Sequence, residues 1–561
     1  MNSVFVIVLG IIVYYLGLQL YAKYYDRKVI QTDPKRATPA RLYADGVDFM
    51  PTSKNILFGY QFKSIAGAAP VLGPIIAIKW GWLPGLLWIL LGTFFIGWIQ
   101  DYTSAVISMR NDGKTFGGIS YTLISPRTRI ILLSFIYFYL LLIAAAFSNV
   151  VATFMANNPN IPFSIIFLAI AGVAVGFLIY HGRINLAIVT IIGLLIFYVT
   201  LFLGNDLPLA LANPSANKIL WLIFALVFSF LGSVLPIWVF VQPVNYLGFY
   251  IILFGMIGAI LGIIVGHPNL KAPAFTSFNA EGLPLWPILF VTIACGAISG
   301  WHSNVSSTGT SRQLEKDTDA RVVTAGAMFL EMILALIALI IVSVTTAKAP
   351  WHALFGQGMG EIFSYIGLPR GWGNAYGPVM IVVLAITILH LVIRFMRIAT
   401  NELLGKKIPA LRNPILGTGV ALILSFFLVY TGTFNYIWVL FGSANQLMAS
   451  LALLIASIWL VSQKKPTRFT FYPMIFMYLT TMSALIYTSI SVLRQAITGL
   501  DLTGKQLTTS SIIGNYFAGG IGLILFVAAI ILAYDGMKAF LKYKKVTSEQ
   551  VTSTQVKESY K

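Results

Sequence analysis

Four ionisable side chains, Asp101, His302, Glu331 and His390, lie within long apolar stretches of this sequence. An ionisable group surrounded by hydrocarbon is costly, so each is a functional candidate. A buried carboxyl or imidazole group could carry a proton or bind a cation. Structural roles are the alternatives: Asp101 could pair with Arg110 or Lys114, Glu331 could be a permanently protonated acid, and His302 could serve only in hydrogen-bonded packing.

A dense run of hydroxyl and amide side chains surrounds His302, in the segment ACGAISGWHSNVSSTGTSRQL. Hydroxyl groups and unpaired carbonyl groups are oxygen ligands that suit a small cation, and they can also hydrogen-bond a carboxylate. We therefore expect substrate contacts from one part of this run and a coupling-ion site in the next. The expected substrate contacts are Ser299, Trp301, His302 and Asn304, and the expected ion ligands are Ser306, Ser307 and Thr308. The alternative is a polar cap at the end of an apolar helix.

Glycine and proline interrupt two other apolar stretches, SIAGAAPVLGPIIAIKW (64–80) and LGSVLPIWVFVQPVN (231–245). Proline removes a backbone donor and clashes with the preceding helical turn, so both stretches should unwind. Interrupted membrane segments at matching positions of two inverted halves indicate the central site of a transporter. The residues expected to line that site are Gly67, Ala68, Ala69, Pro70, Gly73, Gly232, Pro236 and Trp238.

The composition indicates which kind of protein, and which kind of helix, must hold these residues in place. Of 561 residues, 58% are apolar and 10% are charged, whereas about a quarter are charged in a soluble domain. A soluble enzyme, a disordered chain and a nucleic-acid-binding protein are excluded. A membrane helix needs roughly 20 mainly apolar residues. Fifteen windows qualify: 3–21, 64–80, 84–107, 130–157, 162–180, 184–204, 218–240, 246–266, 285–303, 322–347, 376–399, 413–430, 434–461, 471–493 and 511–535.

The basic residues give these windows an orientation. Loops on the cytoplasmic side of a membrane collect Lys and Arg, and 30 of the 37 basic residues fall in alternate loops on one side. The amino terminus is therefore expected outside and the carboxyl terminus inside a cell membrane. This bias also accounts for the net charge of +19 without a nucleic-acid partner; the bilayer itself is the expected macromolecular surroundings.

Sequence signatures of enzymes are missing: there is no HExxH, GxSxG, GxxxxGK[ST] or CxxC pattern. The single cysteine, Cys295, excludes a disulfide framework and a cysteine-cluster metal site. We expect no enzymatic activity, no cofactor and no bound metal. Energy for transport should come from an ion gradient.

Several blocks of sequence identify a family. LFGYQFKSIAGAAPVLGPIIAIKWGWLPGLLW, GWIQDYTSAVISMRNDGKTFG, LPIWVFVQP, PILFVTIACGAISGWHSNVSS, GAMFLEMILALIAL and LFGSANQLMASLALL, in that order from about 52 to 461, resemble the carbon starvation protein A family. The resemblance implies an inner-membrane transporter allied to the amino acid–polyamine–organocation superfamily, linked to uptake of peptides and pyruvate during nutrient limitation, with proton coupling. The chain departs from the family at Tyr60 and Gln61, where a His-His pair is common, and at the run from Ser306 to Thr310.

The predicted fold is an all-α polytopic membrane protein with a five-plus-five inverted-repeat core of the leucine-transporter type. Five windows separate the starts of the two halves, so the halves should face opposite ways. The expected divisions are an extra amino-terminal helix (1–22), a basic cytoplasmic loop (23–63), two repeats (64–204 and 205–400), carboxyl-terminal helices (401–535) and an unstructured cytoplasmic tail (536–561).

The predicted function is import of peptides or pyruvate by alternating access, coupled to protons through Asp101 or Glu331. The amino ends of half-helices suit the carboxylate that both substrates carry. Three alternatives remain: a sodium-coupled carboxylate or amino-acid transporter, a membrane nutrient sensor, and a channel. Segment 267–287 could be an outer lid or a plain connector.

Overall fold

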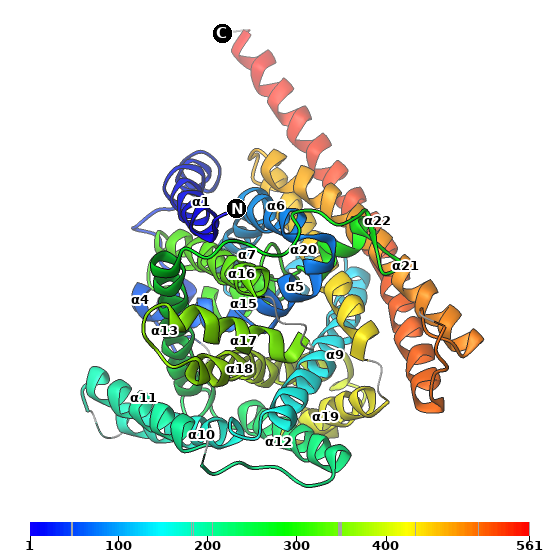
Figure 1. Ribbon diagram of the computed structural model, residues 1–561. Coiled ribbons are helices and arrows are strands. Elements are labelled where there is room, and N and C mark those ends of the chain that lie inside the picture. Colours follow the sequence, from blue (N-terminus) through cyan, green and yellow to red (C-terminus); the bar gives the residue numbers. More distant parts are fainter. Residues whose placement is uncertain are drawn as a thin grey trace.

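The computed structural model describes the chain except residues 46–48, 181, 183, 205, 346–350, 432–433, 503 and 560–561. Arg183, expected in a short basic turn, lies outside the described residues. The described chain is almost entirely helical (Figure 1), with one small antiparallel hairpin formed by β1 (Asn279–Ala280) and β2 (Leu283–Pro284).

Twelve described helical segments are long and apolar enough to cross a membrane. They are α1 to η2 (Ser3–Ile30), α6 to α7 (Trp82–Met109), α9 (Pro126–Asn157), α10 (Pro162–Tyr180), α11 (Leu186–Leu203), α12 (Pro214–Val234), α13 (Val241–Gly266), η7 with α16 (Arg321–Val344), α18 (Arg370–Leu404), α20 (Phe434–Ser462), α21 (Arg468–Thr498) and α22 (Thr509–Ser559). A bent pair, α4 (Lys54–Ile65) with α5 (Ala69–Ala77) and η3 (Ile78–Trp80), makes up to 13. The protein is therefore a multi-pass membrane protein.

The two remaining windows of the fifteen have different forms. Window 413–430 corresponds to α19 (Pro414–Tyr430), which has 17 residues. Window 285–303 is no continuous helix: η5 (Leu285–Leu289) and α14 (Phe290–Thr292) are followed by a break, and α15 (Gly300–Thr308) resumes after it. The exact number of spans stays a prediction.

The first interruption lies where it was expected, but its cause differs. The axes of α4 and of α5 with η3 meet at 43°, and the chain is non-helical after Ile65. Pro70 does not break a helix. It occupies the first turn of α5, where a backbone N–H would have no carbonyl partner within the helix, so its absence costs no helical hydrogen bond. Pro74 lies inside α5. The break therefore falls at residues 66–68, just before the prolines.

The second interruption is not where the prolines predicted it. Gly232 belongs to continuous α12, and Pro236 lies in the short connection between α12 and α13, while Pro243 is in the first turn of α13. A connection between two whole helices accommodates proline without breaking a span. The second interrupted membrane segment is instead 285–308. The predicted interruption of a span at 218–240 is thus wrong, whereas the position of the second repeat's first helix and the five-plus-five repeat itself stay predictions.

The two interrupted segments lie against each other in opposite directions. The amino-terminal half of the first, α4, contacts α15, the carboxyl-terminal half of the second; α5 in turn contacts α14. Figure 1 shows α5 and α15 near the middle of the bundle, with α7 and α16 beside them. An antiparallel pair of this kind brings both breaks to the same depth.

Two of the predicted non-membrane segments contain helices. The basic loop expected at 23–63 begins only after Ile30 and ends at Lys54, and Lys63 is fully buried within α4. The tail expected to be unstructured continues α22 as far as Ser559. No proline or glycine follows Gly536 in that helix, so nothing in the local sequence stops it.

Segment 267–284 crosses one end of the bundle as an irregular strand of chain. Its backbone hydrogen-bonds to Trp80 at the end of η3, to Trp82 at the start of α6 and to Ser343 of α16. These bonds tie it to the carboxyl end of the first interrupted segment. Both the lid and the connector interpretations remain predictions.

A buried acidic residue organises the opposite, basic end of the bundle. Asp317 has no exposed side-chain surface and lies 3.3 Å from Arg110 and 3.5 Å from Arg36. Arg110 and Lys465 also donate to the carbonyl of Ile30, at 3.0 and 2.7 Å. Cations commonly satisfy the last carbonyl groups of a helix in this way. Loops far apart in the sequence are thereby held together.

The pKa of Lys465 gives a first prediction. Burial, and then repulsion by Arg110 and Arg36, lowers it from 10.5 to about 8. Between these two values the unfolded chain binds a proton that the folded protein has lost, so this residue makes stability rise with pH over that range. We expect Lys465→Met to remove that rise from thermal unfolding in detergent between pH 8 and 10.5, and exposed Lys464→Met to keep it. Identical pH profiles for Lys465→Met and the wild type would contradict the assignment.

Close backbone contact between the interrupted segments gives a second prediction. A Cβ on Gly73 of α5 would lie 2.8 Å from the carbonyl oxygen of Thr292 and 3.0 Å from Ile293 Cα. Gly73→Ala should therefore lower the free energy of unfolding by about 1–3 kcal/mol. Gly419→Ala is the matched control, because a Cβ there meets nothing within 4 Å. Thermal unfolding in detergent tests both; equal melting temperatures would refute the close approach.

Candidate functional site

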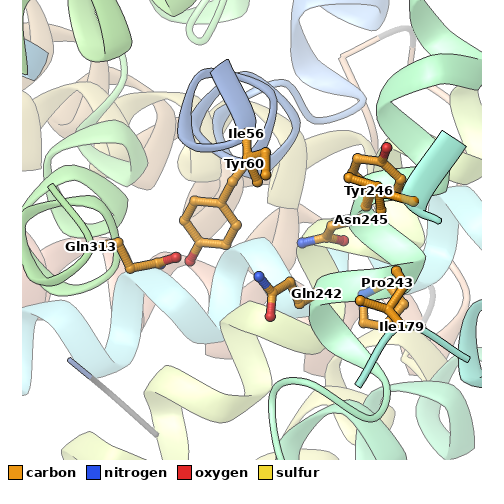
Figure 2. A pocket seen from close by; sticks show the side chains of 9 residues that line it. Ile56, Tyr60, Ile179, Gln242, Pro243, Asn245, Tyr246 and Gln313 are labelled. Carbon is orange, nitrogen blue, oxygen red and sulfur yellow. The ribbon is translucent and has the colours of Figure 1, made fainter. Parts of the chain in front are cut away.

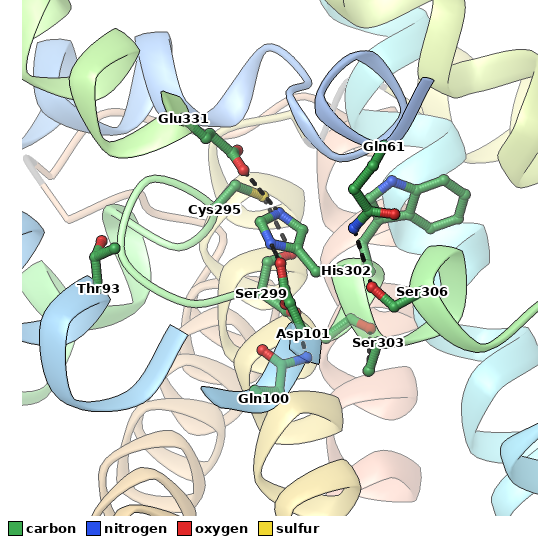
Figure 3. Close-up of polar contacts among 12 residues, drawn as sticks. Gln61, Thr93, Gln100, Asp101, Cys295, Ser299, His302, Ser303, Ser306 and Glu331 are labelled. Carbon is green, nitrogen blue, oxygen red and sulfur yellow. Dashed lines mark hydrogen bonds and ion pairs between the residues drawn. The ribbon is translucent and has the colours of Figure 1, made fainter. Parts of the chain in front are cut away.

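Three buried ionisable residues meet beside the second break. His302 Nδ1 lies 3.1 Å from Asp101 Oδ2, and His302 Nε2 lies 3.1 Å from Glu331 Oε2. All three side chains are fully buried. They come from α7, α15 and α16, and Figure 3 shows His302 between the two carboxylates. The sequence singled out each residue, and the structure brings them into one line.

The unwound backbone of the second break is held by polar side chains. Trp88 Nε1 donates to the carbonyls of Phe290 and Ile293, at 3.0 and 3.1 Å. Thr93 donates to the Gly296 carbonyl at 3.2 Å, and Gln100 donates to the Ser299 carbonyl at 2.8 Å. Non-helical backbone at membrane depth persists only where protein or water satisfies it. These side chains therefore allow the break to exist.

Two neighbouring amides of α20 complete this support. Asn445 accepts from the Trp301 backbone N–H at 2.9 Å and donates to Ser299 Oγ at 2.9 Å. Gln446 donates to the Phe290 carbonyl at 2.9 Å. The sequence analysis missed both residues. The polar pair inside an apolar window, FGSANQLMAS, was the available signal.

Lys63 is the second functional candidate that the sequence analysis missed. Its fully buried ammonium donates to Thr387 Oγ1 at 2.5 Å and to the Ala66 carbonyl at 3.4 Å. It therefore lies at the first break and interacts electrostatically with Glu331. The sequence analysis counted Lys63 among loop charges because the membrane helix was taken to begin one residue later.

The hydroxyl and amide run is bonded largely within the protein. Ser306 Oγ accepts from Gln61 Nε2 at 3.0 Å, while the Ser307 and Thr308 hydroxyls donate to the Asn304 carbonyl at 3.4 and 2.5 Å. Such internal bonds are typical of hydroxyls along a helix.

Hydrogen bonds tie α15 to the first interrupted segment and to α9. Trp301 Nε1 donates to the Ser64 carbonyl at 2.7 Å, and Asn304 Nδ2 donates to Tyr139 at 2.5 Å. The remaining residues predicted at the first break, Gly67, Ala68, Ala69 and Pro70, are all buried at the amino end of α5. Lys63 and these residues thus share one location.

The residues expected from the second proline-rich stretch lie elsewhere. A Cβ on Gly232 would meet His390 at 2.5 Å, and the Trp238 ring packs on Phe177 with centroids 5.7 Å apart. Pro236 is in the connection after α12. Because the interruption is at 293–299, the positions beside the first break are occupied by that segment instead.

A cavity of about 120 Å³ lies between α4, α13 and the chain after α15. Figure 2 shows Tyr60, Gln242, Asn245 and Gln313 around it, and the described lining carries no charge. Tyr60 and Lys63 are three residues apart on α4 and so share a helix face. A Cβ on Gly248 of α13 would lie 3.1 Å from Lys63 Cε. The interface that holds the cavity thus continues to Lys63.

One group of side chains in the described chain has the chemistry of metal ligands. Single donor atoms of Cys295, His302 and Glu331 all lie within 4.8 Å of one another, and all three residues are buried. Cys295 Sγ also lies 3.4 Å from Ser299 Oγ.

The chain is similar in sequence to known transporters. The chain is 26% identical over 655 residues to the pyruvate/proton symporter BtsT of Escherichia coli K12, covering 96% of this chain and 91% of that protein. It is 28% identical to the peptide transporter CstA of Bacillus subtilis 168, covering 86% and 89%. The solved structure of MhsT with L-phenylalanine aligns over 85% of this chain and 99% of its own, with a TM-score of 0.45 and 13% identity.

A family model matches most of the chain. The model described as carbon starvation protein CstA matches residues 2–351 and 344–484. These ranges contain both interrupted segments, the buried acid–histidine–acid line and the supporting amides of α20. The chain therefore belongs to the CstA family of membrane transporters and is not an enzyme.

Proposed function

We propose that this protein is a secondary active transporter that imports small carboxylates, peptides or pyruvate, with protons across the cytoplasmic membrane during nutrient starvation. The observation that carries the proposal is the fully buried line of Asp101, His302 and Glu331 beside the second break. The printed names of the relatives, a pyruvate/proton symporter and peptide transporters, support the substrate class. The proposed orientation, with the amino terminus outside and the carboxyl terminus inside, follows the distribution of basic residues.

The substrate carboxylate binds at the first break in this proposal. Lys63 supplies a positive charge there, next to the amino end of α5. The dipole of that helix also favours an anion at its amino end. Ser299, Trp301 and Asn304 approach from the opposite segment. Gly73, where α5 touches the second break, keeps the two backbones close.

Charge balance explains how such a site couples two solutes. With both acids ionised and His302 protonated, the line carries one net negative charge, which Lys63 balances. A substrate carboxylate adds one negative charge, and binding of one proton by the line restores neutrality. Uncompensated charge inside a membrane protein is costly. The proton and the carboxylate therefore bind together.

Alternating access uses the cavity between α4 and α13 as the cytoplasmic vestibule. It lies near Gln313, in the chain that leads to the basic end, and its interface continues to Lys63. We favour protons over sodium because Asp101, His302 and Glu331 carry groups that can bind and release a proton, and because the relative BtsT is named a pyruvate/proton symporter. A sodium gradient remains an arm of the test below.

Uptake by proteoliposomes tests the coupling. Wild-type protein should accumulate labelled dipeptide or pyruvate under an imposed pH gradient and should not do so under a sodium gradient. Glu331→Gln should reduce gradient-driven accumulation by at least tenfold, about 1.4 kcal/mol, and retain substrate exchange. Glu361→Gln on α17 (Trp351–Ser364), whose carboxylate pairs with Lys271 at 3.1 Å, is the matched control. Full accumulation by Glu331→Gln, or accumulation driven by sodium, would refute proton coupling through this line.

A second uptake experiment tests Lys63. Lys63→Met should raise KM for both substrates by at least tenfold, about 1.4 kcal/mol, because the carboxylate loses its counter-charge. Thr387→Val, which removes only the hydrogen-bond partner of Lys63, should have a smaller effect. In uptake by the wild type, a dipeptide with an amidated carboxyl end should compete poorly with the labelled dipeptide. Unchanged KM in Lys63→Met, with normal thermal unfolding, would place carboxylate recognition elsewhere.

A further inference from the structure

The second break contains a group of donor atoms that proton transfer does not require. Cys295 lies in the non-helical chain between α14 and α15, whereas His302 and Glu331 project from α15 and α16. One donor atom from each lies within 4.8 Å of the others. Sulfur, imidazole nitrogen and carboxylate oxygen are the ligand types that Zn²⁺ and similar ions take in proteins.

Among the described residues, the donor atoms of His302 and Glu331 in this group lack a hydrogen-bond partner, whereas Cys295 Sγ lies 3.4 Å from Ser299 Oγ. Within the described part of the chain, His302 Nε2 and both carboxylate oxygens of Glu331 make no hydrogen bond, although each is buried from solvent. Buried polar atoms are usually hydrogen-bonded, so these three call for another explanation. A cation between them would satisfy all three at once.

Asp101 prepares the histidine for such an ion. Its Oδ2 lies 3.1 Å from His302 Nδ1, and an ionised carboxylate can only accept, so the ring proton sits on Nδ1. The lone pair of Nε2 then points toward Glu331 and Cys295. A metal-ligating histidine almost always donates its other N–H to a carboxylate or carbonyl, which fixes the tautomer and the ring.

Charge also favours a divalent ion at this position. A thiolate from Cys295 and the Glu331 carboxylate together neutralise a charge of +2. Asp101 and Lys63 then balance each other nearby. When the ion binds, the S–H bond of Cys295 and the Nε2–H bond of protonated His302 both break and the two protons pass to the solvent, so the +2 ion leaves the site with no net charge.

We infer that Cys295, His302 and Glu331 form a three-ligand site for a Zn²⁺-class divalent ion, with Asp101 as the positioning residue for His302. The ligands come from the break and from two helices that flank it. A bound ion would therefore tie these segments together and inhibit any motion that separates them. The inference goes beyond the proposed function, because metal binding can be measured without transport.

Cobalt absorption gives a direct test with the purified full-length protein in detergent. Because Cys295 is the single cysteine of the chain, a thiolate-to-cobalt charge-transfer band can arise only at this residue. We expect one equivalent of Co²⁺ to produce that band together with the visible bands of tetrahedral cobalt, and Zn²⁺ to remove both. Cys295→Ser should lose the charge-transfer band. Asp101→Asn should keep it but bind Co²⁺ about 10–100-fold more weakly.

Controls separate this inference from folding and from transport. Exposed His267→Ala and Glu361→Gln should bind Co²⁺ as the wild type does. Zn²⁺ should raise the melting temperature of the wild type and not that of Cys295→Ser, whose melting without metal shows that it folds. A wild-type protein without the thiolate band, or the same band strength in Glu331→Gln at equal Co²⁺, would overturn the site. Uptake that fails while the band persists would refute only the transport proposal.

Discussion

The requirement that backbone polar groups be satisfied at membrane depth governs this structure. Residues 293–299 leave the helical conformation in the middle of an apolar bundle, and their carbonyls would be costly without partners. Trp88 of α6, Gln446 of α20 and Gln100 of α7 supply those partners. Substrate and ion chemistry at the break depends on this support, because an unsupported break would either refold into helix or admit water.

The helix that supplies Asn445 and Gln446 is enclosed by the rest of the protein. The apolar window of α20 that contains Asn445 and Gln446 is entirely buried inside the protein. Helices such as α11 and α22, by contrast, expose most of their surface to the surrounding lipid. A fully enclosed helix has packing contacts on every side and little freedom to move. The second break is therefore held against the most rigid element of the bundle.

Buried charges, like buried hydrogen-bonding groups, need partners. Asp101, His302, Glu331 and Lys63 are all fully buried, and their charges sum to zero when both acids are ionised and His302 and Lys63 are protonated. One of these groups could not be replaced by an apolar residue without leaving another unpaired. This interdependence makes the group sensitive to a substrate charge. The same property makes it attractive to a divalent ion.

Much of this could be predicted from the sequence. Hydropathy located the spans, the glycine-rich segment after Lys63 indicated the first break, and Asp101, His302 and Glu331 stood out as charges in apolar windows. The second break could not be placed, since proline marks a connection between helices as readily as an interruption within one. Lys63 was missed because α4 begins at Lys54, ten residues before the expected start of the span at 64, and this error made a buried charge look like a loop charge. The role of Asn445 depends on a contact across 144 residues with Trp301, which no local pattern encodes.

Asp317 at the basic end has a kinetic consequence. It links the chain after α15 to Arg110 and Arg36 while it is shielded from solvent. Dissolved salt screens exposed charges strongly and buried pairs weakly. Ionic strength should therefore have little influence on how fast these loops separate. Once the loops are apart and hydrated, salt will weaken the attraction between their charges. The rate at which the loops come back together should therefore fall as ionic strength rises.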